Sequence, residues 1–364
     1  MKTHLHFKIT ALVLFAYLRS IAEPVSSGWT NLSCRQYVIV DSLLYAIGSK
    51  GDLLVWNLNT EKLIDGLCIK PRIGFSAIAK DKNKHIYLGN EIGRISVIDS
   101  GKRRKEIWSC GRRRPEGQPI NYISFTSDNR MFVIAKGQLY DVVKRKSRHK
   151  FRHLRQEGFW CSTSWFRITH TPPKYYFLTP ELVFMDKNDV FWLVYGRDVQ
   201  LFDCRKDKVM YEAHDSLSKN GDYVSSIFSD AKGRVNLAYG MNQSDSTYRT
   251  GSLNLGRIYL DQSRKDSAIT VSLIGAGSYN PEDSCIYFDA GKGIYKSHIN
   301  TKWTIEAPKM VHKYDIVWYE RQILENRYSG TLRSMEYIGA SRWLIQGTNY
   351  ELYIFDGRKM RILG

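Results

Sequence analysis

Residues 77–99 read AIAKDKNKHIYLGNEIGRISVID, and the rest of the chain repeats this pattern. A short apolar run leads into a polar turn at residues 81–84, and a second apolar run follows and ends on Gly89. After a turn that contains Gly93, apolar and polar residues alternate over residues 95–99, which is typical of a half-buried strand. The stretch therefore predicts three antiparallel strands. A sheet this thin cannot bury its own faces and needs copies of itself.

The copies recur at intervals that define the repeat. The first three copies end on Asn57, Asp99 and Asp141, so the spacing between them is constant. We place the seven copies at residues 37–57, 77–99, 122–141, 182–203, 224–261, 269–299 and 332–356. The first copy includes strands at residues 43–48 and 53–57, and the sixth has a long first turn at 276–284. Short apolar stretches after most copies supply a fourth strand, at residues 63–67, 106–108, 209–211 and 360–363. Regularly spaced sets of about four strands predict an all-β, seven-bladed β-propeller, and a six-bladed propeller that merges the weak sixth copy is the alternative.

Two short motifs resemble those of WD40-like and bacterial regulator-type propeller repeats. Trp56 and Asn57 stand where the WD dipeptide of a WD40 repeat would be, and residues 125–130, FTSDNR, look like an F-S-P-D-G-R turn. The resemblance covers residues 34–364. Because the Gly-His pair of WD40 repeats is missing and the WD dipeptide is degenerate throughout, the resemblance implies the architecture and no family function.

The N-terminus is typical of a secretory signal peptide. Lys2 and Lys8 precede a short apolar stretch, and Ser20-Ile21-Ala22 is a small-x-small cleavage site. The apolar stretch is too short to span a bilayer, and an uncleaved anchor is the alternative. We therefore expect a mature chain without an integral membrane segment that is secreted, periplasmic or at the cell surface. The predicted organisation is a signal peptide at residues 1–22, a leader at 23–33 and a propeller domain at 34–364.

The chain is strongly basic, with 54 Lys and Arg against 36 Asp and Glu and a formal net charge of +18. Such a surface favours polyanionic partners, and export favours a glycan, an envelope component or a protein over nucleic acid. In a four-stranded blade the first and third hairpin turns emerge on the same face, so the repeat gathers its basic turns on one rim. The alternative is that the basic turns serve solubility. The candidate binding residues are Lys102, Arg103, Arg104, Lys105, Lys144, Arg145 and Lys146.

Three insertions interrupt the repeats, at residues 144–176, 241–255 and 308–330, and such insertions often carry function. The first interleaves arginines with aromatic side chains, of which Trp160 and Trp165 are further candidate binding residues. Exposed aromatics beside arginine suit sugar stacking or a protein-binding hot spot. The alternative is that they extend the core at the edge of a blade.

Six cysteines follow the predicted cleavage site. An even number in an exported chain permits disulfides, whereas each cysteine alone could equally be a small buried hydrophobe. No CxxC motif or Cys/His cluster indicates a metal site. The six are Cys34, Cys68, Cys110, Cys161, Cys204 and Cys285.

Catalytic motifs are weak. Glu181, Asp186 and Asp289 are candidates for a carboxylate pair of the kind used in glycoside hydrolysis, but such residues more often form turns. The sequence has no HExxH motif and no nucleotide-binding loop, so we predict no cofactor and no catalytic residue. We therefore expect an exported, non-catalytic binding or scaffold module. The alternatives are a glycan-active enzyme with a site in the central funnel and a stand-alone ligand-sensing propeller.

Overall fold

The described part of the chain consists of β-strands, their connecting turns and one short 3-10 helix, η1 (Asp65–Leu67). The structure is a computed structural model. It describes residues 34–98, 104–109, 119–135, 138–142, 146–150, 182–195, 198–213, 223–229, 235–240, 253–258, 265–271, 276–289, 293–298, 309–315, 332–347 and 350–364.

Within these residues the strands pair in chain order into seven four-stranded antiparallel sheets. Sheet 1 contains β1 (Cys34–Val40), β2 (Leu43–Gly48), β3 (Leu53–Asn57) and β4 (Lys62–Leu63). Sheet 2 contains β5 (Phe75–Lys80), β6 (Ile86–Asn90), β7 (Arg94–Ile98) and β8 (Arg104–Ser109). Sheet 3 contains β9 (Ile120–Phe125), β10 (Met131–Ala135), β11 (Gln138–Asp141) and β12 (Lys146–Lys150). Sheet 4 contains β13 (Leu182–Met185), β14 (Val190–Tyr195), β15 (Asp198–Asp203) and β16 (Lys208–Ala213).

The remaining three sheets follow the same order. Sheet 5 contains β17 (Tyr223–Ser229), β18 (Val235–Gly240), β19 (Leu253–Ile258) and β20 (Lys265–Val271). Sheet 6 contains β21 (Gly277–Asn280), β22 (Cys285–Asp289), β23 (Gly293–His298) and β24 (Lys309–Lys313). Sheet 7 contains β25 (Leu332–Gly339), β26 (Arg342–Gly347), β27 (Leu352–Phe355) and β28 (Met360–Ile362).

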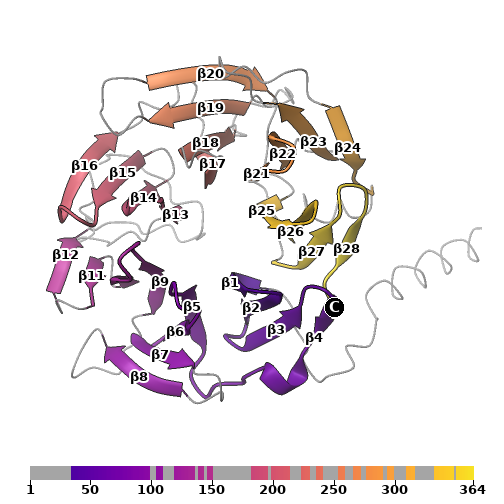
Figure 1. Ribbon diagram of the computed structural model, residues 1–364. Helices are drawn as coiled ribbons and strands as arrows, with labels where there is room; N and C mark the ends of the chain where they lie inside the picture. Colours follow the sequence, from indigo (N-terminus) through magenta and orange to yellow (C-terminus); the bar gives the residue numbers. More distant parts are fainter. Residues whose placement is uncertain are drawn as a thin grey trace, which may run out of the picture.

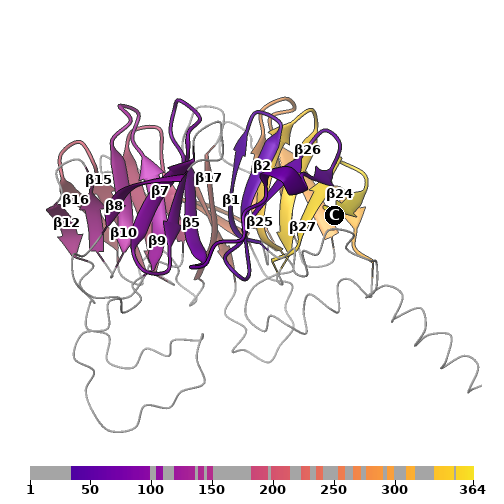
Figure 2. The same cartoon turned by 90° about the horizontal axis from the view of Figure 1, so that it is seen from below.

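The sheets stand side by side around a common centre, with the first strand of each sheet innermost and the fourth outermost (Figure 1). Seen from the side, the strands run between two faces that carry the turns (Figure 2). The first and third turns of a sheet share one of these faces, which we name the turn face. Two contacts illustrate this arrangement, because Arg205 from the third turn of sheet 4 contacts both Asp189 and Ser127, which lie in first turns.

The apolar core lies between neighbouring sheets. One cluster joins Ile47 and Val55 of sheet 1 to Ile78 and Leu88 of sheet 2. Other clusters join sheets 2 and 3, sheets 3 and 4, and sheets 6 and 7. The sheets joined by these clusters thus bury one another's faces, which compensates for their inability to form a core alone.

Sheets 1 and 7, the first and last in the chain, also share a core cluster. Trp56 and Leu44 of sheet 1 pack with Leu344, Ile354 and Leu363 of sheet 7, and all five side chains are buried. The indole Nε1 of Trp56 donates a hydrogen bond to the carbonyl oxygen of Gly364 over 3.1 Å. The two sequence-distant ends of the described chain are therefore in direct contact.

Sheet 6 corrects one part of the sequence prediction. The sixth copy was expected to begin at residue 269 with a long turn at 276–284, but residues 269–271 belong to β20, the outer strand of sheet 5. Sheet 6 begins at β21, within the expected turn. The short polar sequence of this strand, Gly-Ser-Tyr-Asn, lacks the apolar alternation on which strand prediction depends, although Ser278 and Asn280 are buried.

Candidate functional site

Polar side chains from three neighbouring sheets meet near the centre of the molecule. Glu336 lies on β25, Tyr37 on β1 and Lys80 on β5, and all three strands are innermost in their sheets. The Tyr37 hydroxyl is 3.4 Å from Ser334 Oγ, and Lys80 Nζ donates to the Ile39 carbonyl over 2.5 Å. We name Glu336, Tyr37, Ser334 and Lys80 the central cluster.

The environment of Glu336 is unusual for an exposed carboxyl group. Burial raises the pKa of Glu336, and the hydrogen bond from Tyr37 and the charge of Lys80 only partly oppose this. The residue is nevertheless accessible to solvent. The exposed Glu336 carboxyl group thus lies beside the Tyr37 hydroxyl and the Lys80 ammonium group, which belong to two other sheets. Perturbed titratable groups in such places mark candidate binding sites.

The central cluster does not supply the carboxylate pair that glycoside hydrolysis requires. Glu336 is the only carboxylate on the innermost strands in the part of the chain that the structure describes. Asp289 is buried, where it accepts hydrogen bonds from the Tyr314 hydroxyl and the Leu332 backbone, each over 3.1 Å. Asp186 is buried in a turn, and Glu181 lies outside the described residues. The described carboxylates therefore act as anchors of turns and strand ends.

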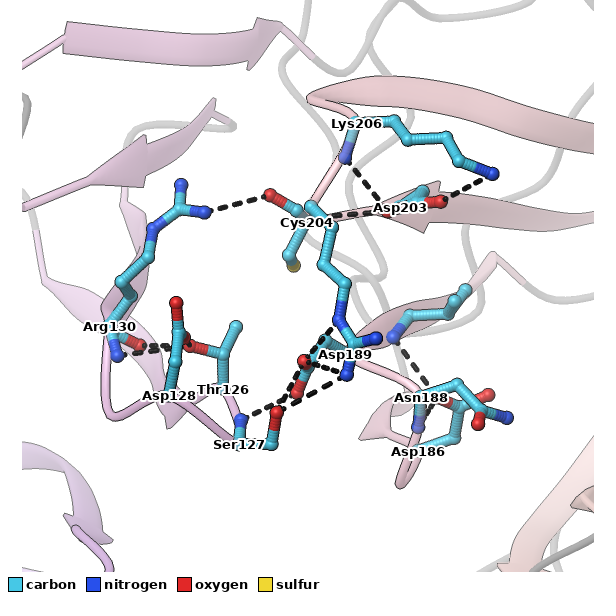
Figure 3. A network of polar contacts seen from close by, with 12 residues as sticks. Thr126, Ser127, Asp128, Arg130, Asp186, Asn188, Asp189, Asp203, Cys204 and Lys206 are labelled. Atoms are coloured by element: carbon cyan, nitrogen blue, oxygen red, sulfur yellow. Dashed lines mark hydrogen bonds and ion pairs between the residues drawn. The ribbon is translucent and has the colours of Figure 1, made fainter.

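A second polar network joins the first turns of sheets 3 and 4 on the turn face (Figure 3). Asp189, with 2% of its surface exposed, accepts hydrogen bonds from the Ser127 backbone N–H over 2.6 Å and from the Ser127 hydroxyl over 2.7 Å. Arg205 Nε donates to the same carboxylate over 2.8 Å. Burial opposes ionisation of Asp189, but the donors from Ser127 and Arg205 outweigh it and lower the pKa.

Local sequence explains why Asp189 points at the neighbouring sheet. Asp186 accepts hydrogen bonds from the backbone of Asn188 and Val190 and from the Trp192 indole, which closes the turn. Asp189 then adopts a left-handed conformation with φ of 63°, which Asp tolerates better than most residues. Asn129 occupies the corresponding position of sheet 3 with φ of 66°, so the conformation belongs to the repeat.

Arg130 extends the network toward the outer strands. Its guanidinium is 2.7 Å from the fully buried Asp141 carboxylate and donates to the Cys204 carbonyl over 3.2 Å. Burial raises the pKa of the Cys204 thiol, which is therefore inert as a nucleophile. The network is a set of satisfied polar contacts between two sheets, which is the chemistry of a structural clamp.

Most of the predicted basic rim lies outside the described residues. Six of the predicted binding residues fall in undescribed segments: Lys102, Arg103, Lys144, Arg145, Trp160 and Trp165. Arg104 belongs to β8 and Lys146 to β12, but their side chains are not described. Lys105, on β8, is exposed. The rim as a binding surface thus stays a prediction.

The described turns show how the molecule uses part of its basic charge. Lys84 pairs with Asp41 across sheets 2 and 1, Arg205 pairs with Asp189, and Arg361 pairs with Glu61 across sheets 7 and 1. The sequence shows turns rich in Lys and Arg. It does not show that acidic residues from other repeats pair with them.

The cysteines that can be described form no disulfide. Cys68, Cys204 and Cys285 carry reduced thiols, and the last two are completely buried, in line with the alternative of small buried hydrophobes. Cys285 Sγ lies 3.2 Å from His298 Nδ1. The side chains of Cys34, Cys110 and Cys161 lie outside the described part.

The described residues lack two further features that functional sites can have. They contain no group of three or more His, Cys, Asp or Glu placed to hold a metal ion. No helix among them has the length and apolar character needed to cross a membrane.

Comparison with known proteins gives a likeness of fold. No family model matches the sequence, and no curated protein matches it. Among 1183 solved chains that match is the extracellular domain of a putative hybrid two-component system from B. thetaiotaomicron. The match has a TM-score of 0.51 and 12% sequence identity, and it covers 92% of this chain and 38% of that chain. The present chain therefore spans well under half of its structural neighbour, and the likeness concerns the fold alone.

Proposed function

We propose that the chain is an exported, closed seven-bladed β-propeller that binds a polyanionic glycan, envelope or protein partner without catalysing a reaction. In this proposal residues 1–22 are a signal peptide, residues 23–33 a leader and residues 34–364 the propeller. The seven sheets around one centre and the shared core of sheets 1 and 7 support the closed architecture. The neighbour is an extracellular domain, which is compatible with export.

The distribution of charge carries the proposal of a polyanionic partner. The chain has a formal net charge of +18, and some acids on the described turn face are paired with basic groups, as in Asp189 with Arg205 and Glu61 with Arg361. The runs at residues 102–105 and 144–146 contain no acid of their own. In this proposal the positive charge of these runs is what a ligand binds, and binding of this kind weakens steeply with salt.

Retention on immobilised heparin tests the proposal. A variant carrying Arg103→Glu, Arg104→Glu and Arg145→Glu is expected to elute at much lower salt than the unmodified mature chain. The matched control carries Lys50→Glu, Lys70→Glu and Arg72→Glu, which makes the same change in net charge on the opposite face. Equal loss of retention in both variants, or no loss in the first, would contradict a binding rim, and thermal unfolding verifies that both variants are folded.

A stand-alone ligand-sensing module is the second candidate, and the central cluster favours it. Glu336, Tyr37 and Lys80 bring an acid, a hydroxyl and an ammonium group from three sheets close together at the centre of the molecule. A small ligand in this space would raise the unfolding temperature of the chain but not that of a Glu336→Gln variant. A screen of small polar molecules by thermal shift distinguishes this role from rim binding, which Glu336→Gln leaves unchanged.

A further inference from the structure

The outer edge of sheets 6 and 7 combines basic and apolar side chains. Lys309, Met310 and Lys313 on β24 are exposed, as are Arg358 and Lys359 in the last turn of sheet 7 and Ile362 on β28. Met310 is 39% exposed and Ile362 is 58% exposed, the largest value among the large hydrophobic residues described. We name these six residues the basic–apolar edge.

The edge is one continuous surface and not two separate strands. His312 Nδ1 on β24 donates to the carbonyl oxygen of Arg358 over 3.0 Å, which joins the strand to the last turn of sheet 7. The His312 ring also packs against Phe355, with ring centroids 5.5 Å apart. Beneath the surface, Val311 and Met360 pack against the same core cluster. Both views place β24 beside the outer strands of sheet 7 (Figures 1 and 2).

The basic groups of the edge are not neutralised by the described residues around them. Lys309, Lys313, Arg358 and Lys359 form no ion pair within the part of the chain that the structure describes. Asp356, the acid of the adjacent turn, is occupied: it accepts hydrogen bonds from the backbone of Arg358 and Lys359 and pairs with Arg361. The edge thus presents positive charge around exposed apolar side chains.

The strands themselves argue against a peptide that adds to a sheet. β28 is only three residues long, β24 carries a lysine at each end, and a register shift interrupts the pairing of β23 with β24. Short strands, edge lysines and bulges are the devices by which proteins block strand addition. A soluble polyanion, for its part, would leave Met310 and Ile362 in water.

A flat surface with an anionic layer above an apolar layer would contact both the basic groups and the exposed apolar side chains of the edge. We propose that the basic–apolar edge binds the surface of an anionic lipid membrane, with the lysines and Arg358 at the headgroups and Met310 and Ile362 inserted between them. Basic residues near such a surface add to affinity one by one, and shallow apolar insertion adds a part that salt does not screen. This site and partner are distinct from the rim of sheets 2 and 3 in the proposed function.

Vesicle sedimentation tests the proposal on the full mature chain. Vesicles of phosphatidylglycerol and phosphatidylcholine are expected to bind the protein at low salt, whereas vesicles of phosphatidylcholine alone bind it far more weakly. Lys309→Gln with Lys359→Gln should weaken the partition coefficient roughly thirtyfold, since each basic residue contributes about fivefold. The matched control, Lys82→Gln with Lys208→Gln, removes the same charge from exposed residues of sheets 2 and 4 and should bind nearly as well as the unmodified chain.

A second variant distinguishes insertion of apolar side chains into the membrane from electrostatic attraction to its surface. Met310→Ser with Ile362→Ser removes no charge, and it should lower the partition coefficient by about tenfold, also at high salt. The proposal is overturned if the unmodified chain does not bind anionic vesicles, if both lysine variants lose binding equally, or if the serine variant binds fully. Loss of vesicle binding in the Arg103, Arg104 and Arg145 variant alone would assign the lipid to the rim instead. Heparin retention of the Lys309 and Lys359 variant shows independently whether the proposed function stands.

Discussion

The junction between sheets 3 and 4 and the junction between sheets 7 and 1 solve the same packing problem by different means. At the first, the buried carboxylate of Asp189 binds Ser127 and Arg205. At the second, the ion pair between Arg361 and Glu61 is partly exposed, with 43% of the Arg361 side chain accessible, and the packing is built on the apolar cluster around Trp56.

The difference follows from chain connectivity. Sheets 3 and 4 are consecutive in the sequence, so a directional polar clamp needs only to set their relative orientation. Sheets 7 and 1 are joined by no local segment, and their contacts must compensate for the entropy of bringing distant parts of the chain together. Apolar burial supplies more free energy for this than exposed ion pairs do. Both junctions contain a buried apolar cluster, and we therefore expect the buried hydrogen bonds to add more stability at the first junction than the exposed ion pair adds at the second.

Trp56→Ala should have the largest effect of the changes considered. It removes a completely buried indole from the cluster shared by sheets 1 and 7, and core truncations of this size cost about 3–5 kcal/mol in the free energy of unfolding. Denaturant unfolding of the protein measures the loss. Trp56→Phe keeps an aromatic ring and loses the hydrogen bond to Gly364, so it should cost clearly less. Equal costs would show that the hydrogen bond, not packing, holds this junction.

Asp189→Ala should rank second. The change leaves the Ser127 backbone N–H and hydroxyl without their acceptor and places alanine at φ of 63°, for an expected cost of about 2–3 kcal/mol. Asp189→Asn keeps an acceptor and tolerates the left-handed conformation, so it serves as the control and should be milder. If both variants unfold at the denaturant concentration of the unmodified chain, the network of Figure 3 does not stabilise the molecule.

Acidification should lower the free energy of unfolding, because both junctions contain carboxyl groups with lowered pKa values. Burial disfavours the charged form of Asp356, but hydrogen bonds from the Lys359 and Arg358 backbone and from Arg361 lower its pKa to about 2. The folded-state pKa lies below that of the unfolded chain, so this stabilisation is present at neutral pH and is lost as pH falls from about 4 to 2. Unfolding free energies measured across this range should fall less steeply for Asp356→Asn; identical slopes would contradict the assignment.

Arg361→Gln should have the smallest effect, below about 1 kcal/mol, because the ion pair with Glu61 is largely at the surface. The loss should vanish in about 1 M salt, where such pairs are screened. Arg130→Gln is the informative comparison. Its partner Asp141 is completely buried, so its loss should persist in salt. A salt-insensitive cost at Arg361 would mean that this side chain contributes mainly through packing.

The sequence predicted strands well where a short run is mainly apolar. The expected strands at residues 43–48 and 53–57 coincide with β2 and β3, and the expected fourth strand near residues 209–211 lies within β16. Where apolar residues are few, as in β21, the boundary was wrong. The strand expected at residues 63–67 is only two residues of β4 followed by η1, since Asp65 and Gly66 favour a turn.

The polar sites were harder to predict because their members come from different repeats. Asp189 looks like any turn residue until Ser127 of the preceding sheet is placed beside it. In the sequence, Glu336 stands out only as a charged residue within a strand-like run. Its neighbours Tyr37 and Lys80 lie in the first two repeats, so the sequence does not show that the three residues are close together. Local pattern thus specifies each sheet, whereas the chemistry between sheets depends on the order in which the fold arranges them.

Each sheet is built from one contiguous stretch of chain, with strands in sequence order, and this has a consequence for synthesis on the ribosome. Most contacts of a sheet can form as soon as its own residues and those of the next sheet emerge. Sheet 1 is the exception: the apolar face that includes Trp56 and Leu44 receives its partner only when sheet 7 has been made. Throughout translation this apolar face is exposed on the nascent chain. Chaperones would bind there first, and premature association would begin there.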